Sequence, residues 1–205
     1  MSITVIKLGG SLMHGNTLLH WLDSIQKFSR NHNVVIVPGG GEFADNVREM
    51  QRQIKFDEQT AHRLALLAMS QYGYLMAGLN STIQIVDDIS KLLSEMDKQL
   101  PLLWLPNCLL DDFSEIPASW DYSSDSVAVW LASKLAARQL ILVKSIAINS
   151  PGSSLNQLVE NSYIDKGFQR VIDNYSGKLL WFEQNQFDLL NNMNGFENES
   201  LEIRF

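Results

Sequence analysis

The apolar positions of the chain form short runs that alternate with stretches of helical spacing. Ile3–Leu8 is apolar and β-branched, and residues 34–37 are apolar at every position, which is typical of strands covered on both faces in a parallel sheet. Residues 16–30 instead carry apolar side chains three and four positions apart. That spacing predicts an amphipathic helix with Asn16 as its cap.

The same two patterns recur along the rest of the chain. Further strands are predicted at 83–86, 102–105, 140–143 and 178–182, and further helices at 42–53, 58–80, 87–99, 125–139 and 185–193. Alternation of this kind predicts an α/β fold with a largely parallel central sheet. Ligands of such sheets bind at the carboxyl ends of the strands, so these ends are the first places to look for chemistry.

Composition narrows the class of protein. The chain has 205 residues with a net charge of −7 and no basic tract, which argues against a nucleic-acid surface and requires any site for an anion to be local. Its single cysteine, Cys108, excludes an internal disulfide and favours a reducing compartment. The sequence shows no signal-peptide pattern and no apolar run of membrane-spanning length. We expect a cytoplasmic protein that acts without a membrane.

Two glycine clusters follow predicted strands. The first is Lys7 with Gly9, Gly10 and Ser11, and the second is the run Gly39, Gly40 and Gly41. Each has two interpretations, a plain tight turn or a loop whose N–H groups approach an anion. Glycine is entropically costly, and two such loops at two parallel strand ends favour a phosphate site.

Two charged residues also lie at the boundaries of predicted elements, as the glycine clusters do. Asp125, preceded by Ser124, opens a predicted helix, where it is either part of a helix cap or a carboxylate that orients nearby lysines. Lys144 ends an apolar strand, and either extends into solvent or provides a second cation beside Lys7.

Together these stretches, in this order, resemble the amino acid kinase superfamily, which includes acetylglutamate kinase, aspartokinase and bacterial uridylate kinase. The segments that carry the resemblance are IKLGGS, VVIVPGGGEFA, YSSDSVAVWLASKL, LVKSIAIN and the C-terminal NNMNGFENESLEIRF. The glycine motif and AHRLALLAMSQYG further resemble short kinases similar to the archaeal kinase of methanofuran synthesis. The resemblance implies a three-layer αβα sandwich over a single domain, 1–205. About 1–115 would bind the acceptor and about 116–205 the nucleotide.

The resemblance also implies roles for individual residues in transfer of the γ-phosphoryl group of ATP. Lys7, Asp125 and Lys144 would be catalytic, with Asp125 fixing the lysines, and Mg²⁺ would accompany ATP on phosphates and water without a dedicated set of protein ligands. Nucleotide contacts would come from Gly9, Gly10, Ser11, Ser124, Lys144 and, as a weaker candidate for the second cation, Lys178. Acceptor contacts would come from Gly39, Gly40, Gly41, Asp121 and Arg48, with Arg63 as an alternative to Arg48 and a solvated helix face as the competing interpretation of both.

Other positions leave the acceptor open. An Asp-Gly pair of many relatives is replaced by Asn149-Ser150, and Asp121 replaces an asparagine of acetylglutamate kinase, which argues against acetylglutamate. The acceptor is a small phosphate or carboxylate, with aminomethylfuran phosphate as one candidate. A uridylate kinase-like enzyme and a non-catalytic binding protein remain alternatives. Trp120 either lines the acceptor pocket or packs, His62 is expected to pack, and the helix with Met69 and Met76 is a candidate interface of a homo-oligomer.

Overall fold

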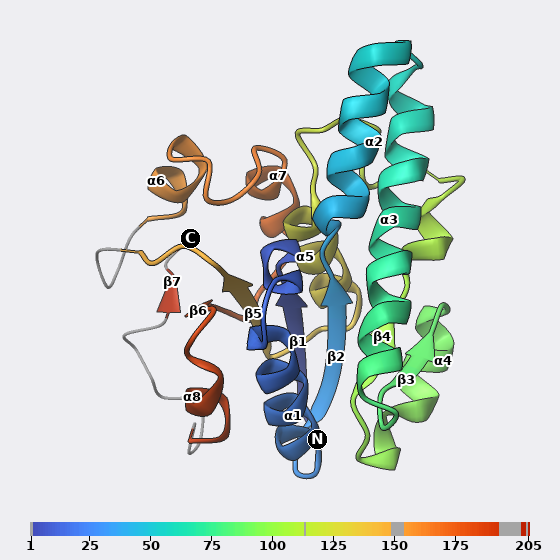
Figure 1. The fold of residues 1–205 in the computed structure, drawn as a ribbon. Helices are drawn as coiled ribbons and strands as arrows, with labels where there is room; N and C mark the ends of the chain where they lie inside the picture. The colour runs from blue at the N-terminus through green and yellow to red at the C-terminus, as the bar shows by residue number, and fades with distance from the viewer. Residues whose placement is uncertain (1, 113, 149–153, 193–201, 204) are drawn as a thin grey trace.

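A mostly parallel sheet forms the centre of the molecule (Figure 1). The computed structural model describes all residues except 1, 113, 149–153, 193–201 and 204. In this described part, seven strands form one sheet in the order β3-β4-β2-β1-β5-β6-β7, and β7 alone pairs antiparallel, with β6. The strands are β1 (Ile3–Leu8), β2 (Asn33–Pro38), β3 (Gln84–Val86), β4 (Leu102–Trp104), β5 (Gln139–Lys144), β6 (Lys178–Glu183) and β7 (Glu202–Ile203).

Helices cover both faces of this sheet, as the α/β prediction requires. Figure 1 shows α1 and α8 in front of the strands and α5 behind them, while α2 and α3 pack side by side and extend beyond the carboxyl end of β2. The helices are α1 (Thr17–Ser29), α2 (Gly41–Ile54), α3 (Glu58–Leu79), α4 (Ile89–Glu95), α5 (Ser124–Lys134), α6 (Leu155–Glu160), α7 (Phe168–Ile172) and α8 (Phe187–Asn191), with 3₁₀ turns η1 (Gly10–Met13), η2 (Met96–Lys98) and η3 (Pro106–Leu109). None of the helices described is long and apolar enough to cross a membrane.

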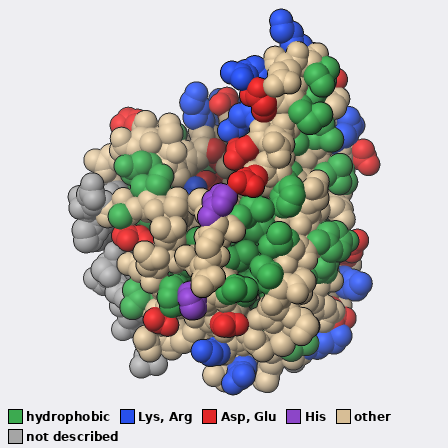
Figure 2. Space-filling view, viewed as in Figure 1, with side chains coloured by type: hydrophobic (Ala, Val, Ile, Leu, Met, Phe, Trp, Pro, Cys, Tyr) green, Lys and Arg blue, Asp and Glu red, His purple; other side chains and the backbone are tan. Residues whose placement is uncertain are grey.

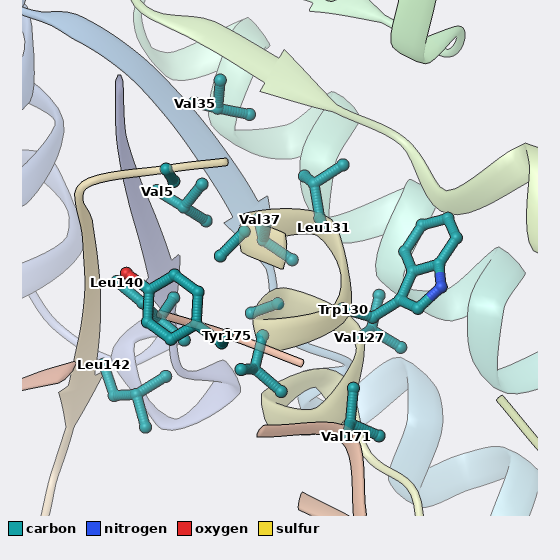
Figure 3. Packing of buried hydrophobic residues seen from close by; sticks show 14 of the residues in the cluster. Val5, Val35, Val37, Val127, Trp130, Leu131, Leu140, Leu142, Val171 and Tyr175 are labelled. Carbon is teal, nitrogen blue, oxygen red and sulfur yellow. The ribbon is translucent and has the colours of Figure 1, made fainter. Parts of the chain in front are cut away.

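Alternate strand residues supply two separate cores, one on each face of the sheet. Val5, Val37 and Leu140 point toward α5, where they meet Val127 and Leu131 (Figure 3). The strand residues that alternate with these, such as Ile6, Ile36 and Ile141, face α1 on the other side of the sheet. Central strands that are buried on both faces read as continuous apolar runs, which explains the pattern in the sequence.

The structure corrects two expectations about helices. The helix predicted to run to 139 ends at Lys134, because Ala136 adopts a positive φ of 45° and the N–H of Ala137 returns to the carbonyl of Ala132. The helix predicted at 87–99 is α4 followed by a 3₁₀ turn. Met69 and Met76 are buried in the core, so an interface on this helix would use its other side chains.

Candidate active site

The carboxyl ends of β1 and β5 bring the predicted charged residues together. The two strands are parallel neighbours with Leu8 opposite Val143, so Lys7 and Lys144 project at the same edge of the sheet. Helix α5 begins over this edge and places Asp125 in its first turn. Three residues that lie far apart in the sequence thus form one cluster.

Asp125 bridges the two lysines. Its Oδ1 lies 2.9 Å from Lys7 Nζ and its Oδ2 lies 2.5 Å from Lys144 Nζ, and the carboxylate and Lys7 are almost completely buried. Lys144 also donates a hydrogen bond of 2.9 Å to the carbonyl of Tyr163. The N-cap of α5 is Ser123, whose hydroxyl accepts from the N–H of Asp125, so Asp125 is free to pair with the lysines.

Burial and charge compete for the protonation states of this cluster. Burial by itself would raise the pKa of Asp125, but the charges of Lys144 and Lys7 outweigh it and hold the pKa at about 2. Burial lowers the pKa of Lys7, and the charge of Asp125 opposes that change. The carboxylate is therefore ionised at neutral pH, and the ionised carboxylate is what stabilises a buried ammonium beside it.

The two glycine turns touch each other at this edge. The N–H of Gly9 donates to the carbonyl of Val143 at 3.1 Å, and the N–H of Gly39 donates to the carbonyl of Leu8 at 2.9 Å. These two N–H groups are thus engaged with backbone, contrary to the expectation that they would face phosphate. A Cβ on Gly10 would lie 2.3 Å from the backbone of Gly41, so glycine is required for this close approach.

Other N–H groups of the turns lie at the starts of helices. The 3₁₀ turn η1 begins at Gly10 and α2 begins at Gly41, and the first N–H groups of a helix have no acceptor within that helix. No side chain caps α2 at its N-cap, Gly40. Lys7 Nζ lies close by, since a Cβ on Gly9 would be 3.9 Å from it. Helix starts and an ammonium group therefore converge, which is an arrangement that binds anions.

A pocket of about 260 Å³ opens beside these turns, and Figure 2 shows a recess between the projecting α2–α3 pair and the rest of the molecule. Lys7 and Asp125 are not among its lining residues, but Ser123 and Ser124, which precede Asp125, are. Three kinds of group line it: helix starts at one end, apolar and aromatic side chains along the sides, and two charged groups on α2. The lining residues are Gly10, Ser11, Gly40, Gly41, Ala44, Asp45, Arg48, His62, Ala65, Leu66, Met69, Trp120, Tyr122, Ser123, Ser124 and Val127.

Of the two predicted arginines, the structure brings Arg48 to the pocket. Its guanidinium lies 4.5 Å from the centre of the Trp120 ring, and the indole N–H of Trp120 donates to Gln51 Oε1 at 2.6 Å. Trp120 therefore lines this pocket, which agrees with the first of its two interpretations, a pocket residue rather than a packing residue. Arg63 is held by the carbonyl of Leu110 at 3.0 Å and does not line the pocket.

Three further predictions concern residues at the margin. Asp121 is exposed, lies 3.9 Å from Lys166 Nζ and is not on the pocket wall. His62 lines the pocket from α3, and burial lowers its pKa. Asn149-Ser150 lies outside the described residues, as does most of the C-terminal segment of the resemblance.

The structure contradicts the nucleotide contact predicted for Lys178. It opens β6 opposite Gln139, the first residue of β5, whereas Lys144 pairs with Glu183 at the other end of the same strands. Lys178 therefore lies at the amino edge of the sheet, where its ammonium contacts Glu202 at 2.9 Å. The predicted strand at 178–182 already begins with Lys178, so the rule that ligands bind at the carboxyl ends of parallel strands argued against this role.

Sequence reasoning missed one carboxylate beside the cluster. Asp165 precedes α7 and accepts hydrogen bonds from Ser123 and Ser126, on either side of Asp125. It also accepts from the N–H of Phe168, the first residue of α7, at 2.8 Å. No sequence signal pointed to Asp165, because α7 is too short for its apolar spacing to predict a helix.

Transfer of a phosphoryl group requires cations and N–H groups around the negatively charged group as it passes from one oxygen to another. The fold and the cluster provide both at one sheet edge, which is the arrangement expected of a phosphotransferase. The sequence model of the amino acid kinase family matches residues 2–148, and the chain belongs to this family.

Individual relatives agree with this membership. The chain is 28% identical, over 89% of its length and 85% of the relative's, to [5-(aminomethyl)furan-3-yl]methyl phosphate kinase of Methanocaldococcus jannaschii. Its fold matches uridylate kinase of Archaeoglobus fulgidus with a TM-score of 0.71, 16% identity and 100% of both chains covered. It also matches the UMP kinase of Ureaplasma parvum with a TM-score of 0.69, 14% identity, and 98% and 97% of the chains covered. The predicted three-layer α/β fold is confirmed.

Proposed function

We propose that this kinase transfers the γ-phosphoryl group of ATP to the phosphate of a small phosphate monoester, making a diphosphate. The observation that carries the proposal is the Lys7–Asp125–Lys144 cluster, which lies against the helix starts of an acceptor-sized pocket. In the reaction an oxygen of the acceptor phosphate forms a bond to the γ-phosphorus. The bond from this phosphorus to the β-phosphate oxygen breaks, and ADP leaves.

Lys7 and Lys144 stabilise the negative charge of the transferring group, and Asp125 holds them in place. Phosphoryl transfer needs positioning and electrostatic stabilisation rather than covalent chemistry by the protein. A phosphate monoester is largely a dianion at neutral pH, since its second pKa is about 6, so its oxygen attacks without a general base. The proposed mechanism needs no general base, which agrees with the position of the Asp125 carboxylate between two ammonium groups.

The nucleotide lies over the half of the chain from about 116 to 205, and the acceptor over about 1–115, with Gly10, Ser11 and Gly41 between them. The pocket also receives walls from the second half, through Trp120 and Tyr122. Mg²⁺ accompanies ATP. Among the described residues, no group of three or more histidine, cysteine or carboxylate side chains is placed to hold a metal. Phosphate oxygens and water would supply its ligands, which is how Mg²⁺ is usually bound with nucleotides.

Aminomethylfuran phosphate is the acceptor that we propose. Support comes from the name of the Methanocaldococcus jannaschii relative, which matches most of both chains. The pocket also suits a small ring with charged ends. Trp120 and Tyr122 offer aromatic faces, the helix starts suit the phosphate, and Asp45 offers a carboxylate to an ammonium group. The reaction then belongs to methanofuran-type coenzyme synthesis in the cytoplasm.

A coupled ADP-release assay with ATP and Mg²⁺ tests the acceptor. We expect [5-(aminomethyl)furan-3-yl]methyl phosphate to give the highest kcat/KM, at least about 100-fold above UMP, isopentenyl phosphate and acetylglutamate, since its ammonium and ring would both be recognised. Equal or better turnover of UMP would replace this proposal with the uridylate kinase alternative. ATP binding without turnover of any acceptor would favour a binding protein.

We further propose that the chain forms a homodimer through α3. This helix of 22 residues is about 33 Å long and exposes a stripe of large apolar side chains (Figure 2). Tyr74 and Leu79 are the most exposed members, at 61% and 48%, and Leu67 and Leu75 complete the stripe. Exposed apolar side chains that share one long helix are typical of an interface, and a second copy offers a helix with the same stripe.

Light scattering after size exclusion tests the dimer. Wild-type protein should elute at twice the 23.2 kDa chain mass. The pair Tyr74→Glu and Leu79→Glu should weaken dimerisation at least about 100-fold, because charges would be buried between apolar side chains. Leu93→Glu is the matched control, since Leu93 is equally exposed but lies on α4. A wild-type monomer, or a dimer untouched by the α3 pair, would exclude this interface.

A further inference from the structure

Asp165 makes contacts on both sides of the central carboxylate. Its Oδ2 accepts from the N–H and the hydroxyl of Ser123, at 2.9 and 2.6 Å, and from the N–H of Ser126 at 3.1 Å. Its Oδ1 accepts from the hydroxyl of Ser126 at 2.5 Å and from the N–H of Phe168 at 2.8 Å. Two oxygens thus receive five hydrogen bonds, four of them from the two serines that flank the Ser124–Asp125 pair.

These bonds fix the first turn of α5. Ser123 is the N-cap and Ser126 lies one residue beyond Asp125, so a carboxylate bound to both determines where the backbone of Asp125 lies. A small rotation of this turn would move the Asp125 carboxylate away from one lysine. Errors of about 1 Å in such groups are costly in phosphoryl transfer.

The same short segment holds the other parts of the site. Two residues before Asp165, the carbonyl of Tyr163 accepts the hydrogen bond of Lys144. Two residues after it, the N–H of Gly167 donates to the carbonyl of Asp121 at 2.6 Å, and a Cβ on Gly167 would collide with the ring of Tyr122. The segment from 163 to 167 therefore contacts a catalytic lysine, the start of α5 and the pocket wall.

Asp165 also adds a second negative charge near two ammonium groups. Three charges influence the pKa of Lys7: those of Asp125 on α5, Lys144 on β5 and Asp165 in the segment before α7. Burial raises the pKa of Asp165, and the charge of Asp125 raises it further. The charge of Asp165 favours the ammonium form of Lys7. When Asp165 is included, the cluster contains two lysines and two carboxylates.

On the basis of the kinase function proposed above, we propose that Asp165 is a positioning residue for phosphoryl transfer. Its carboxylate fixes Ser123 and Ser126 so that the Asp125 carboxylate spans both lysines, and its negative charge adds to that of Asp125 in favouring the ammonium form of Lys7. It acts through its neighbours and touches neither substrate.

Two measurements on Asp165→Asn test the proposal, with Asp173→Asn as a matched control on the exposed end of α7. The first follows the [¹³C]ε-lysine resonance of Lys7, assigned by its absence from Lys7→Met, through a pH titration of the protein alone. We expect the pKa of Lys7 to fall in Asp165→Asn, because a neighbouring negative charge is lost, and to stay unchanged in Asp173→Asn. An unchanged pKa in both variants overturns the electrostatic part.

The second measurement is turnover of ATP with [5-(aminomethyl)furan-3-yl]methyl phosphate. In Asp165→Asn we expect kcat to fall about tenfold to 100-fold with the acceptor KM changed less than about threefold, and the alkaline limb of the kcat profile to move to lower pH. Full kcat in a variant that is merely less stable overturns the positioning role. If wild-type protein does not turn over, the proposed function fails, and the Lys7 titration still decides the electrostatic part.

Ser126→Ala keeps the proposal testable if Asp165→Asn does not fold. It removes one hydrogen bond from Asp165 and keeps its charge. We expect a loss in kcat of about threefold to tenfold with the Lys7 titration unchanged, since only positioning is weakened. A kcat equal to that of wild type overturns the positioning role.

Discussion

Replacing Lys7 with methionine is expected to reduce kcat for phosphoryl transfer by roughly 1,000-fold or more. The ammonium lies beside the glycine turn and 2.9 Å from Asp125, where it would meet the transferring group. Removing one preorganised cation or donor from such a site typically costs two to four orders of magnitude. Initial rates of ADP release at saturating ATP and acceptor measure the loss.

The fold should survive this substitution. Methionine fills the same buried volume, and Asp125 keeps Lys144 as a partner. Far-ultraviolet circular dichroism and a cooperative melt verify folding, and Lys27→Met is the control, since Lys27 lies exposed on α1. Turnover like that of wild type in a folded Lys7→Met protein would contradict the catalytic role of Lys7.

Replacing Asp125 with asparagine is expected to reduce both stability and activity. The variant leaves two ammonium groups facing each other with no carboxylate between them. Breaking a buried ion pair on one side costs about 3–5 kcal/mol in the free energy of unfolding. Urea unfolding at pH 7 measures it, with Asp23→Asn on the exposed face of α1 as the control. A loss below about 1 kcal/mol would show that the bridge does not hold the lysines.

The pH dependence of unfolding separates the charge of Asp125 from its shape. In the folded state its pKa is about 2, below the ordinary 3.8, so its stabilisation is complete above about pH 4 and is lost as the pH falls toward 2. The free energy of unfolding of wild type should therefore lose roughly 2 kcal/mol more than that of Asp125→Asn over this window. Equal pH dependence would mean that Asp125 is not ionised between the lysines.

The sheet and the cluster could largely be predicted, because strong local patterns coincide with tertiary contacts there. Residues 34–37 are apolar at every position since both faces of β2 are buried. Lys7 and Lys144 lie at the same edge because they end neighbouring parallel strands. Parallel pairing carries every carboxyl end to the same side, so the predicted strands placed both lysines at one edge, although each lysine alone could have extended into solvent.

The remaining residues depend on contacts that local pattern does not encode. Lys178 was assigned to the site although it begins its strand, whereas Lys144 ends one. Asp165 acts across a separation of 42 residues from Ser123, and no spacing reveals such a pair. Gly9 and Gly39 were expected to donate to phosphate, yet their N–H groups join strand ends to each other. In all three cases direction or long-range pairing decides the role.

Transfer between two phosphates is the central claim, and phosphorus NMR tests it most directly. Wild-type protein is incubated with ATP, Mg²⁺ and [5-(aminomethyl)furan-3-yl]methyl phosphate, with Lys7→Met in parallel. We predict that the monoester resonance is replaced by the two coupled resonances of a diphosphate as ADP appears, and that this exchange is at least about 1,000-fold slower in the variant. An unchanged monoester with ATP intact, or ATP converted only to ADP and inorganic phosphate, would contradict the claim.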